Sequence, residues 1–221
     1  MNNLCMLFII TNYNEEKRFL KVINKKNIGF KFIMHGTGLA SRSLLEYFGL
    51  TEEKKVIITS ILPKVIAKKV LMELETKLNL DVPGKGIAFT IPLSSTTKYM
   101  LDFYQEHEME DIEMKEANQH LIVTITNEGF AEKVMDVAQK NGATGGTTLN
   151  GRGLDSEKVV KFLNISIEPE KDIILILVPT DKKNDIMNAI ISECGLKTPG
   201  AGICFSLPVD HAVGLNKNFN K

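Results

Sequence analysis

The chain carries one pattern of short motifs twice, and this repetition is the strongest constraint on its fold. Three motifs recur at a spacing of 115 or 116 positions. They are Ile10-Thr11-Asn12 with Ile125-Thr126-Asn127, Gly36-Thr37-Gly38 with Gly151-Arg152-Gly153, and Pro83-Gly84-Lys85-Gly86 with Pro199-Gly200-Ala201-Gly202. A fixed spacing of this kind indicates that each copy is one structural unit. The sequence therefore predicts a tandem duplication.

The length of the chain fits this interpretation. A chain of 221 residues, with 43% hydrophobic and 24% charged residues, has the composition of a globular protein with one or two domains. The repeat spacing predicts a first unit over residues 1–93 and a second over residues 119–210. An acidic linker is predicted over residues 94–118 and a polar tail over residues 211–221.

Apolar runs and helical periodicity predict the same order of elements in both copies. In the first copy, strands are expected at 4–11, 30–34, 56–62 and 86–92, and helices at 15–26 and 63–80. In the second copy, strands are expected at 121–126, 144–149, 173–178 and 202–207, and helices at 130–141 and 181–194. The order βαββαβ is that of the ferredoxin-like unit. The predicted fold class is therefore α+β, with two tandem ferredoxin-like units.

The connection between the second and third strand is unusually long in each copy, about 20 residues where a hairpin uses two to five. Gly36-Thr37-Gly38 is expected to close the second strand of the first copy, and an amphipathic segment is expected over 41–48. In the linker, a helical face is expected around Met100 to Tyr104. A long loop in both copies suggests either a functional loop or a lid over a sheet face.

Charge and composition argue against several classes of function. Because the net charge is zero and the pI is near 6.9, the basic footprint of a nucleic-acid-binding protein is missing. The longest apolar run falls short of the roughly 18 residues of a membrane span. Cys5, Cys194 and Cys204 have no metal-binding or disulfide spacing, which favours buried thiols in a reducing cytoplasm. Neither a catalytic constellation nor a metal site is predicted.

Taken together, these features resemble the PII signal-transduction family. The resemblance is carried by the βαββαβ order, the long loop that opens with a Gly-x-Gly, and the Gly-x-Gly-x-x-Phe before the fourth strand, as in Gly84 to Phe89 and Gly200 to Phe205. It covers nearly all of both repeats. It implies a non-enzymatic regulator, built as a homo-oligomer, with a trimer expected first and a dimer second.

The resemblance also implies a ligand, an adenine nucleotide (AMP, ADP or ATP) in a cleft between neighbouring units, and a target protein that docks on the long loops, with nitrogen metabolism as the setting. The implied ligand-binding residues are Gly36, Gly38, Gly84, Lys85, Gly86, Gly151, Arg152, Gly153, Gly200, Ala201 and Gly202. Glycine lets the backbone N–H groups approach a phosphate or a base edge closely. No cofactor is required.

This chain departs from the family pattern at the glycine turns. The family has a lysine directly after the second glycine, and Ile87 and Ile203 stand there instead. Fewer cations favour a ligand of lower charge. The alternative is an interaction protein of the same fold that has lost ligand binding. Replacing Gly200 or Gly202 with valine is predicted to remove ligand binding and to leave the protein folded.

Overall fold

The chain forms two compact units in the computed structural model, which describes residues 4–26, 28–39, 53–82, 84–104, 118–152, 160–162, 165–167, 170–196 and 202–215. Unit 1 consists of Met1–His35, Lys54–Gln119 and Pro208–Lys221, and unit 2 consists of Gly36–Glu53 and His120–Leu207. Gly36–Glu53, which the sequence places in the first repeat, therefore belongs to unit 2. Pro208–Lys221, which comprises the end of the second repeat and the predicted tail, belongs to unit 1. The predicted ranges 1–93, 94–118, 119–210 and 211–221 stay predictions as domain boundaries.

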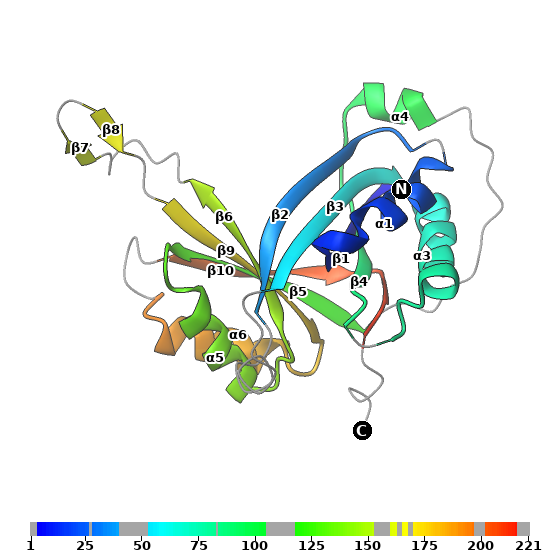
Figure 1. The fold of residues 1–221 in the computed structure, drawn as a ribbon. Coiled ribbons are helices and arrows are strands. Elements are labelled where there is room, and N and C mark those ends of the chain that lie inside the picture. Colours follow the sequence, from blue (N-terminus) through cyan, green and yellow to red (C-terminus); the bar gives the residue numbers. More distant parts are fainter. Residues whose placement is uncertain are drawn as a thin grey trace. The chain divides into compact units, whose positions relative to one another are not determined.

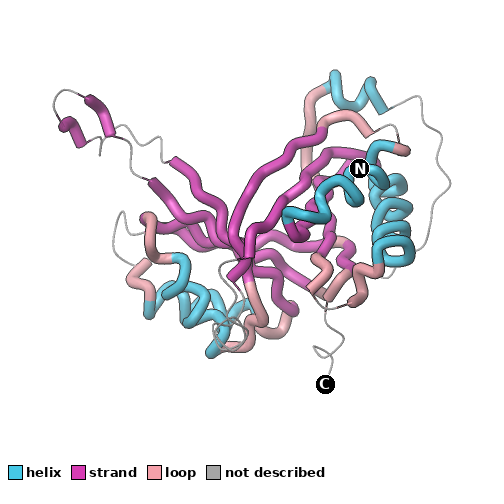
Figure 2. Tube along the Cα trace, viewed as in Figure 1, coloured by secondary structure: helices cyan, strands magenta, loops and turns pink. Residues whose placement is uncertain are grey.

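Unit 1 is a ferredoxin-like βαββαβ unit with an added helix and strand (Figures 1 and 2). Its elements are β1 (Leu4–Asn12), η1 (Tyr13–Glu15), α1 (Glu16–Asn24), β2 (Lys31–Leu39), β3 (Glu53–Pro63), α3 (Lys64–Leu78), β4 (Ile87–Pro92), α4 (Lys98–Tyr104) and β11 (His211–Val213). The strand order is β2-β3-β1-β4-β11. Helices α1 and α3 cover one face of this sheet.

Unit 2 repeats the same order with a small hairpin inside its long loop. Its elements are β5 (Gln119–Asn127), α5 (Ala131–Lys140), β6 (Gly146–Arg152), β7 (Val160–Phe162), β8 (Ile165–Ile167), β9 (Glu170–Pro179), α6 (Lys183–Glu193) and β10 (Gly202–Val209). The strand order is β10-β5-β9-β6, and residues 37–39 of β2 pair with β6. Both units thus place their four common strands in the order fourth, first, third, second. The predicted fold class is confirmed.

Each unit has its own apolar core, because the helices bury side chains that recur three and four positions apart. In unit 1, Phe19 and Ile23 of α1 meet Val70 and Leu74 of α3 over the sheet. The core of unit 2 is formed by side chains of α5, α6, β5 and β9. They include Ile122, Val134, Met135, Ala138, Ile174, Ile176, Val178, Ile186 and Ile190.

The structure corrects one detail of the second strand. Gly36-Thr37-Gly38 was expected to close it, but the strand continues through the triplet to Leu39. Glycine usually weakens a strand, and here a backbone partner compensates. Thr37, Gly38 and Leu39 pair with Thr148, Thr147 and Gly146. The amphipathic segment expected over 41–48 lies outside the described residues.

The helix expected in the linker is confirmed as α4. Its last residue, Tyr104, is buried, and the hydroxyl group donates a hydrogen bond of 2.7 Å to the Ile61 carbonyl oxygen. Phe103 and Tyr104 both make edge contacts with Phe30. This helix therefore packs on the β2 and β3 side of unit 1.

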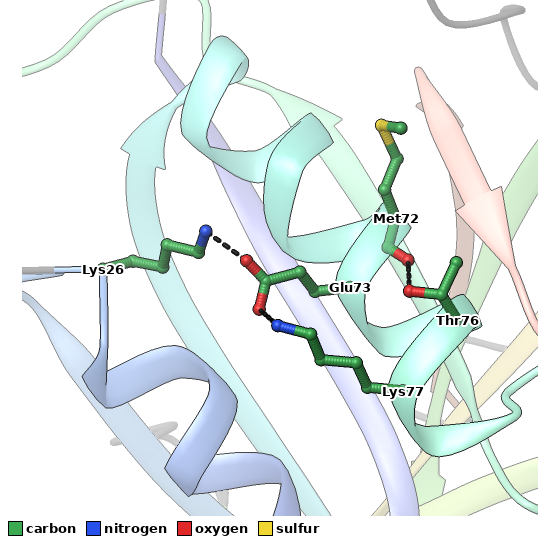
Figure 3. Close-up of polar contacts among 5 residues, drawn as sticks. All are labelled: Lys26, Met72, Glu73, Thr76 and Lys77. Carbon is green, nitrogen blue, oxygen red and sulfur yellow. Dashed lines mark hydrogen bonds and ion pairs between the residues drawn. The ribbon is translucent and has the colours of Figure 1, made fainter.

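A charged bridge joins α1 to α3 on the surface of unit 1 (Figure 3). Glu73 accepts an ion pair from Lys26, which follows α1, and a second one of 2.8 Å from Lys77, one turn along α3. These two hydrogen-bonded lysines lower the pKa of the Glu73 carboxyl group. On the same turn of α3, the Thr76 hydroxyl group donates to the Met72 carbonyl oxygen at 2.8 Å.

The bridge predicts a pH dependence that Glu73→Gln removes. Because the folded-state pKa of Glu73 is lowered, its contribution to stability is present above the unfolded pKa of about 4.5 and is lost as the pH falls through the folded pKa. We expect the difference in unfolding free energy between wild type and Glu73→Gln to shrink between about pH 6 and pH 3. Urea unfolding at both pH values measures it. Glu75→Gln, at an exposed position of the same helix, should show no such change.

Candidate functional site

The first glycine turn connects α3 to β4 in unit 1. Helix α3 ends at Leu78, and the next residue, Asn79, has left-handed backbone angles (φ 53, ψ 47). The N–H group of Val82 donates to the Asn79 carbonyl oxygen at 3.0 Å, and that of Lys85 donates to the Val82 carbonyl oxygen at 3.2 Å. Gly84 lies within this turn at φ +83, with open space where a Cβ atom would stand. The turn is therefore fixed by its own backbone, and Gly84 and Lys85 face solvent.

The second glycine of this turn is required by packing. Gly86 has φ +131, and a Cβ atom there would lie 2.5 Å from the Ile10 carbonyl oxygen and 3.1 Å from the Thr11 Cβ atom. The Thr11 hydroxyl group donates a hydrogen bond of 2.8 Å to the Lys85 carbonyl oxygen. The end of β1 thus contacts both Lys85 and Gly86 of the turn.

Unit 2 repeats the packing of the second glycine at the equivalent residue. Gly202 has φ +152, and a Cβ atom there would overlap the Ile125 carbonyl oxygen and approach the Leu196 side chain and the Thr126 Cα atom. Gly200 and Ala201 lie outside the described residues. Valine at Gly202 would not leave the protein folded as predicted, because its side chain would displace β5 from β10.

A second contact that recurs in both units lies beside each glycine turn. The Lys55 ammonium group donates to the Asn12 side-chain oxygen at 2.5 Å, and the Lys171 ammonium group donates to the Asn127 side-chain oxygen at 2.7 Å. Each asparagine ends the first strand of its unit, and each lysine lies near the start of the third. In both units the Ile-Thr-Asn motif thus supplies a carbonyl oxygen and an amide at one end of the sheet, and in unit 1 it also supplies the Thr11 hydroxyl contact.

These asparagine and lysine residues were not among the predicted site residues. The signal was present in the sequence, since Asn12 and Asn127 belong to the repeated motif and Lys55 and Lys171 recur at the repeat spacing of 116 positions. The pairing of β1 with β3 then sets Asn12 directly opposite Lys55. A search for polar residues repeated in both copies would have found them.

The predicted loop-base glycines lie in strands. Gly38 pairs with Thr147 in unit 2, while Gly151 and Arg152 pair with Lys171 and Glu170. Gly36 also belongs to β2. Gly153 lies outside the described residues. Because a sheet ladder engages every second N–H group of a strand on each side, these glycines are held in an extended backbone instead of a free turn.

In unit 2, the predicted features gather at one end of the sheet. Gly202 lies against the end of β5, where Asn127 contacts Lys171 at the start of β9. Lys171 in turn pairs with Gly151 near the end of β6. Neighbouring strands lie about 4.8 Å apart, so the row from β10 to β6 spans roughly 14 Å.

In unit 1, the same sheet end adds an aromatic pair. Tyr13 directly follows Asn12, and its ring lies 5.5 Å from the ring of His35 on β2, with the two ring planes tilted by 49°. Both side chains are exposed. Exposed aromatic rings can stack on a planar ligand. The equivalent residues of the second repeat are Glu128 and Asn150, so the two sheet ends differ.

The remaining chemistry of the described residues is limited. No group of three or more His, Cys, Asp or Glu residues in the described part of the chain is placed to hold a metal ion. None of the helices described is long and apolar enough to cross a membrane. Burial raises the pKa of the Cys5 thiol to about 12, with Asp210 as the next cause, and burial also raises the pKa of Cys204. At neutral pH both thiols are therefore protonated.

A shallow hollow of about 680 Å³ lies elsewhere in unit 2, between the end of α5 and the outer side of α6. Lys140, Lys182, Asp185, Asn188 and Ser192 are among its lining residues, and all of them are exposed. None of the predicted site residues lines it. The glycine turns and their sheet ends therefore remain the candidate site.

Comparison with known proteins gave similarity in structure alone. No protein-family model matches the sequence, and no curated protein matches it. Among solved structures, Arabidopsis thaliana PII bound to citrate is 22% identical, with a TM-score of 0.33, and the match covers 42% of this chain and 77% of that one. CPII from Thiomonas intermedia K12, bound to ADP, AMP and acetate, is 17% identical, with a TM-score of 0.34 and coverage of 46% and 94%. The B. subtilis GlnK–ATP complex is 20% identical, with a TM-score of 0.32 and coverage of 44% and 90%.

Proposed function

We propose that this chain is a PII-like regulatory protein without enzymatic activity. It binds a small metabolite, an adenine nucleotide such as AMP, ADP or ATP, and passes the bound state to a partner protein through its long loops. In this proposal it acts in the cytoplasm as a homo-oligomer, a trimer first and a dimer second. Nitrogen metabolism is the setting that the family resemblance implies.

The observation that carries this proposal is the sheet end of unit 2. There Gly202, the Asn127–Lys171 pair and the end of β6 at Gly151 lie in one row. A ligand in this row would touch both the turn and the strand ends from which the long loop departs. Ligand binding would therefore change the conformation of the long loop, because the strand ends that contact the ligand also anchor the loop.

The charge at the equivalent sheet ends of both units suits an anionic or polar ligand. Lys85 in unit 1 is exposed, and its ammonium group pairs with no acid in the described part of the chain. Lys171 is held at the start of its strand by a neutral asparagine, which does not neutralise the lysine charge. The proposed ligand contacts are Gly36, Gly38, Gly84, Lys85, Gly86, Gly151, Arg152, Gly153, Gly200, Ala201 and Gly202.

One observation favours the second candidate, an interaction protein that has lost ligand binding. Gly86 and Gly202 are both explained by packing against Ile10 and Ile125. These glycines would be needed for the fold whether or not a ligand binds. Ligand binding must therefore be tested at side chains that the fold does not require.

Lys85→Glu is such a test. Isothermal titration with AMP, ADP and ATP should give saturable binding to wild type, and a ligand at 100 times its Kd should raise the unfolding free energy by about 2.7 kcal/mol. Lys85→Glu should weaken binding by about tenfold, because one charge-assisted contact becomes a repulsion. Lys17→Glu changes an equally exposed lysine on α1 and should bind like wild type.

If none of the three nucleotides binds in a saturable way, the interaction protein becomes the better description. If Lys85→Glu and Lys17→Glu weaken binding equally, the effect is one of net charge, and the glycine turn of unit 1 is not the site.

A further inference from the structure

The fourth strands of the two units, β4 and β10, are equivalent but have different neighbours at their outer edges. In unit 1, β4 pairs on its outer side with β11: His211, Ala212 and Val213 lie opposite Thr90, Phe89 and Ala88. In unit 2, the equivalent strand β10 ends the strand order, and no described strand pairs with it on the side away from β5. Among the described residues, the same edge is thus closed in unit 1 and open in unit 2.

The side chains on the two edges differ accordingly. Phe89 lies opposite Ala212, stacks on the ring of Phe8 and is 0% exposed. Its counterpart in β10, Phe205, is 39% exposed, and Ile203 beside it is 58% exposed. An edge strand with free N–H and C=O groups and exposed apolar side chains is a site for the addition of another strand.

We infer that the outer edge of β10 binds an extended segment of a second copy of this chain. The closed edge indicates the occupant, because this chain itself supplies the strand that covers β4. That strand directly follows the last strand of the second repeat. The equivalent segment after β4 is residues 93–97, which lies 116 positions before 209–213.

Residues 93–97 are suited to this addition. They lie outside any strand, and Ser94, Ser95 and Thr97 are exposed. In the register of β11 on β4, Ser95, Thr96 and Thr97 of the second copy would lie opposite Ser206, Phe205 and Cys204. Threonine is a good strand former and carries no charge that would oppose burial of the edge. This inference identifies a surface for the oligomer that the proposed function includes, and it does not depend on the ligand.

Ile203→Lys tests this edge directly. In analytical ultracentrifugation, the wild-type protein should have a molecular mass above the 24.7 kDa of one chain. Ile203→Lys should have the mass of a single chain, because its self-association should be weakened by at least about tenfold. Phe130→Lys is the matched control, because Phe130 is a 42% exposed residue of unit 2 outside β10. The control should sediment like wild type. A wild type that stays at 24.7 kDa at every concentration, or an Ile203→Lys variant that associates like wild type, would overturn the inference.

Cross-linking tests the register. In a chain with Thr96→Cys and Phe205→Cys, mild oxidation should give a covalent dimer in which position 96 of one copy is joined to position 205 of the other. Thr96→Cys combined with Phe130→Cys should give no such dimer. Absence of the 96–205 link in a wild-type-like oligomer would show that another surface holds the copies together. Titration of the Ile203→Lys variant with AMP, ADP and ATP measures nucleotide binding separately from self-association. A failure of the edge inference can then be told apart from a failure of the proposed ligand site.

Discussion

Gly86→Ala and Gly202→Ala are expected to destabilise their units strongly, each by roughly 2–5 kcal/mol. Two effects add at each position. The backbone has φ +131 at Gly86 and φ +152 at Gly202, where a side chain is strained, and the new Cβ atom would press on the Ile10 or Ile125 carbonyl oxygen. That carbonyl belongs to a buried strand in the centre of the sheet, which cannot move without disturbing its neighbours. A loss of this size is a large fraction of the roughly 5–15 kcal/mol that holds a typical domain.

Glycines with open surroundings provide matched controls. Gly84 in the same turn has φ +83, and Gly195 in unit 2 has φ +74, and at both positions an added Cβ atom would meet nothing within 4 Å. Alanine at these positions should cost only the backbone strain, about 1–2 kcal/mol. Denaturant unfolding of the four variants separates the two effects. If Gly86→Ala and Gly84→Ala lose the same stability, the contact with Ile10 is not what requires the second glycine.

Most of the fold could be predicted because the core elements follow simple patterns. The run from Leu4 to Thr11 is apolar because β1 is covered on its helical face and flanked by β3 and β4. Phe19, Val22 and Ile23 fall on one side of a helix and are all buried. These patterns recur in the second repeat, and so each prediction was supported twice.

The short additions could not be predicted, since they depend on a partner and not on their own residues. His211, Ala212 and Val213 are too few to signal a strand, and they form β11 because β4 offers a free edge. Gly36-Thr37-Gly38 has the composition of a turn, and it stays extended because β6 pairs with it. In both cases the decisive information lies more than 100 positions away in the chain.

The candidate site was located in part. The repeated glycine turns were found from the sequence, and the structure adds why the second glycine of each turn is needed. The Asn12–Lys55 and Asn127–Lys171 contacts required the strand register, which sequence spacing alone does not fix. The buried carboxylate of Asp172, which accepts hydrogen bonds of 3.1 Å from the N–H groups of Phe130 and Ala131 at the start of α5, has no counterpart in the first repeat, where Val56 stands.

Gly214→Ala is expected to release β11 from unit 1. Gly214 follows β11 at φ +84, and a Cβ atom there would overlap the Gly86 carbonyl oxygen and lie 3.0 Å from that of Leu80. The segment is held at its other end by Asp210, whose N–H group donates to the Thr90 carbonyl oxygen at 2.9 Å and whose carboxylate pairs with Lys64 at 2.9 Å. We expect a loss of roughly 2–5 kcal/mol, because strain and overlap act together on a strand of three residues.

Hydrogen exchange locates this effect better than global unfolding does. In Gly214→Ala, the amides of β11 and of the β4 edge should lose protection together, whereas those of β1 and β3 should stay protected. Gly129→Ala is the control, because Gly129 has nearly the same angle, φ +85, in open surroundings. If β11 keeps its protection in Gly214→Ala, the strand is held mainly by Asp210 and its pairing with β4. Gly214 would then not be required to keep β11 paired with β4.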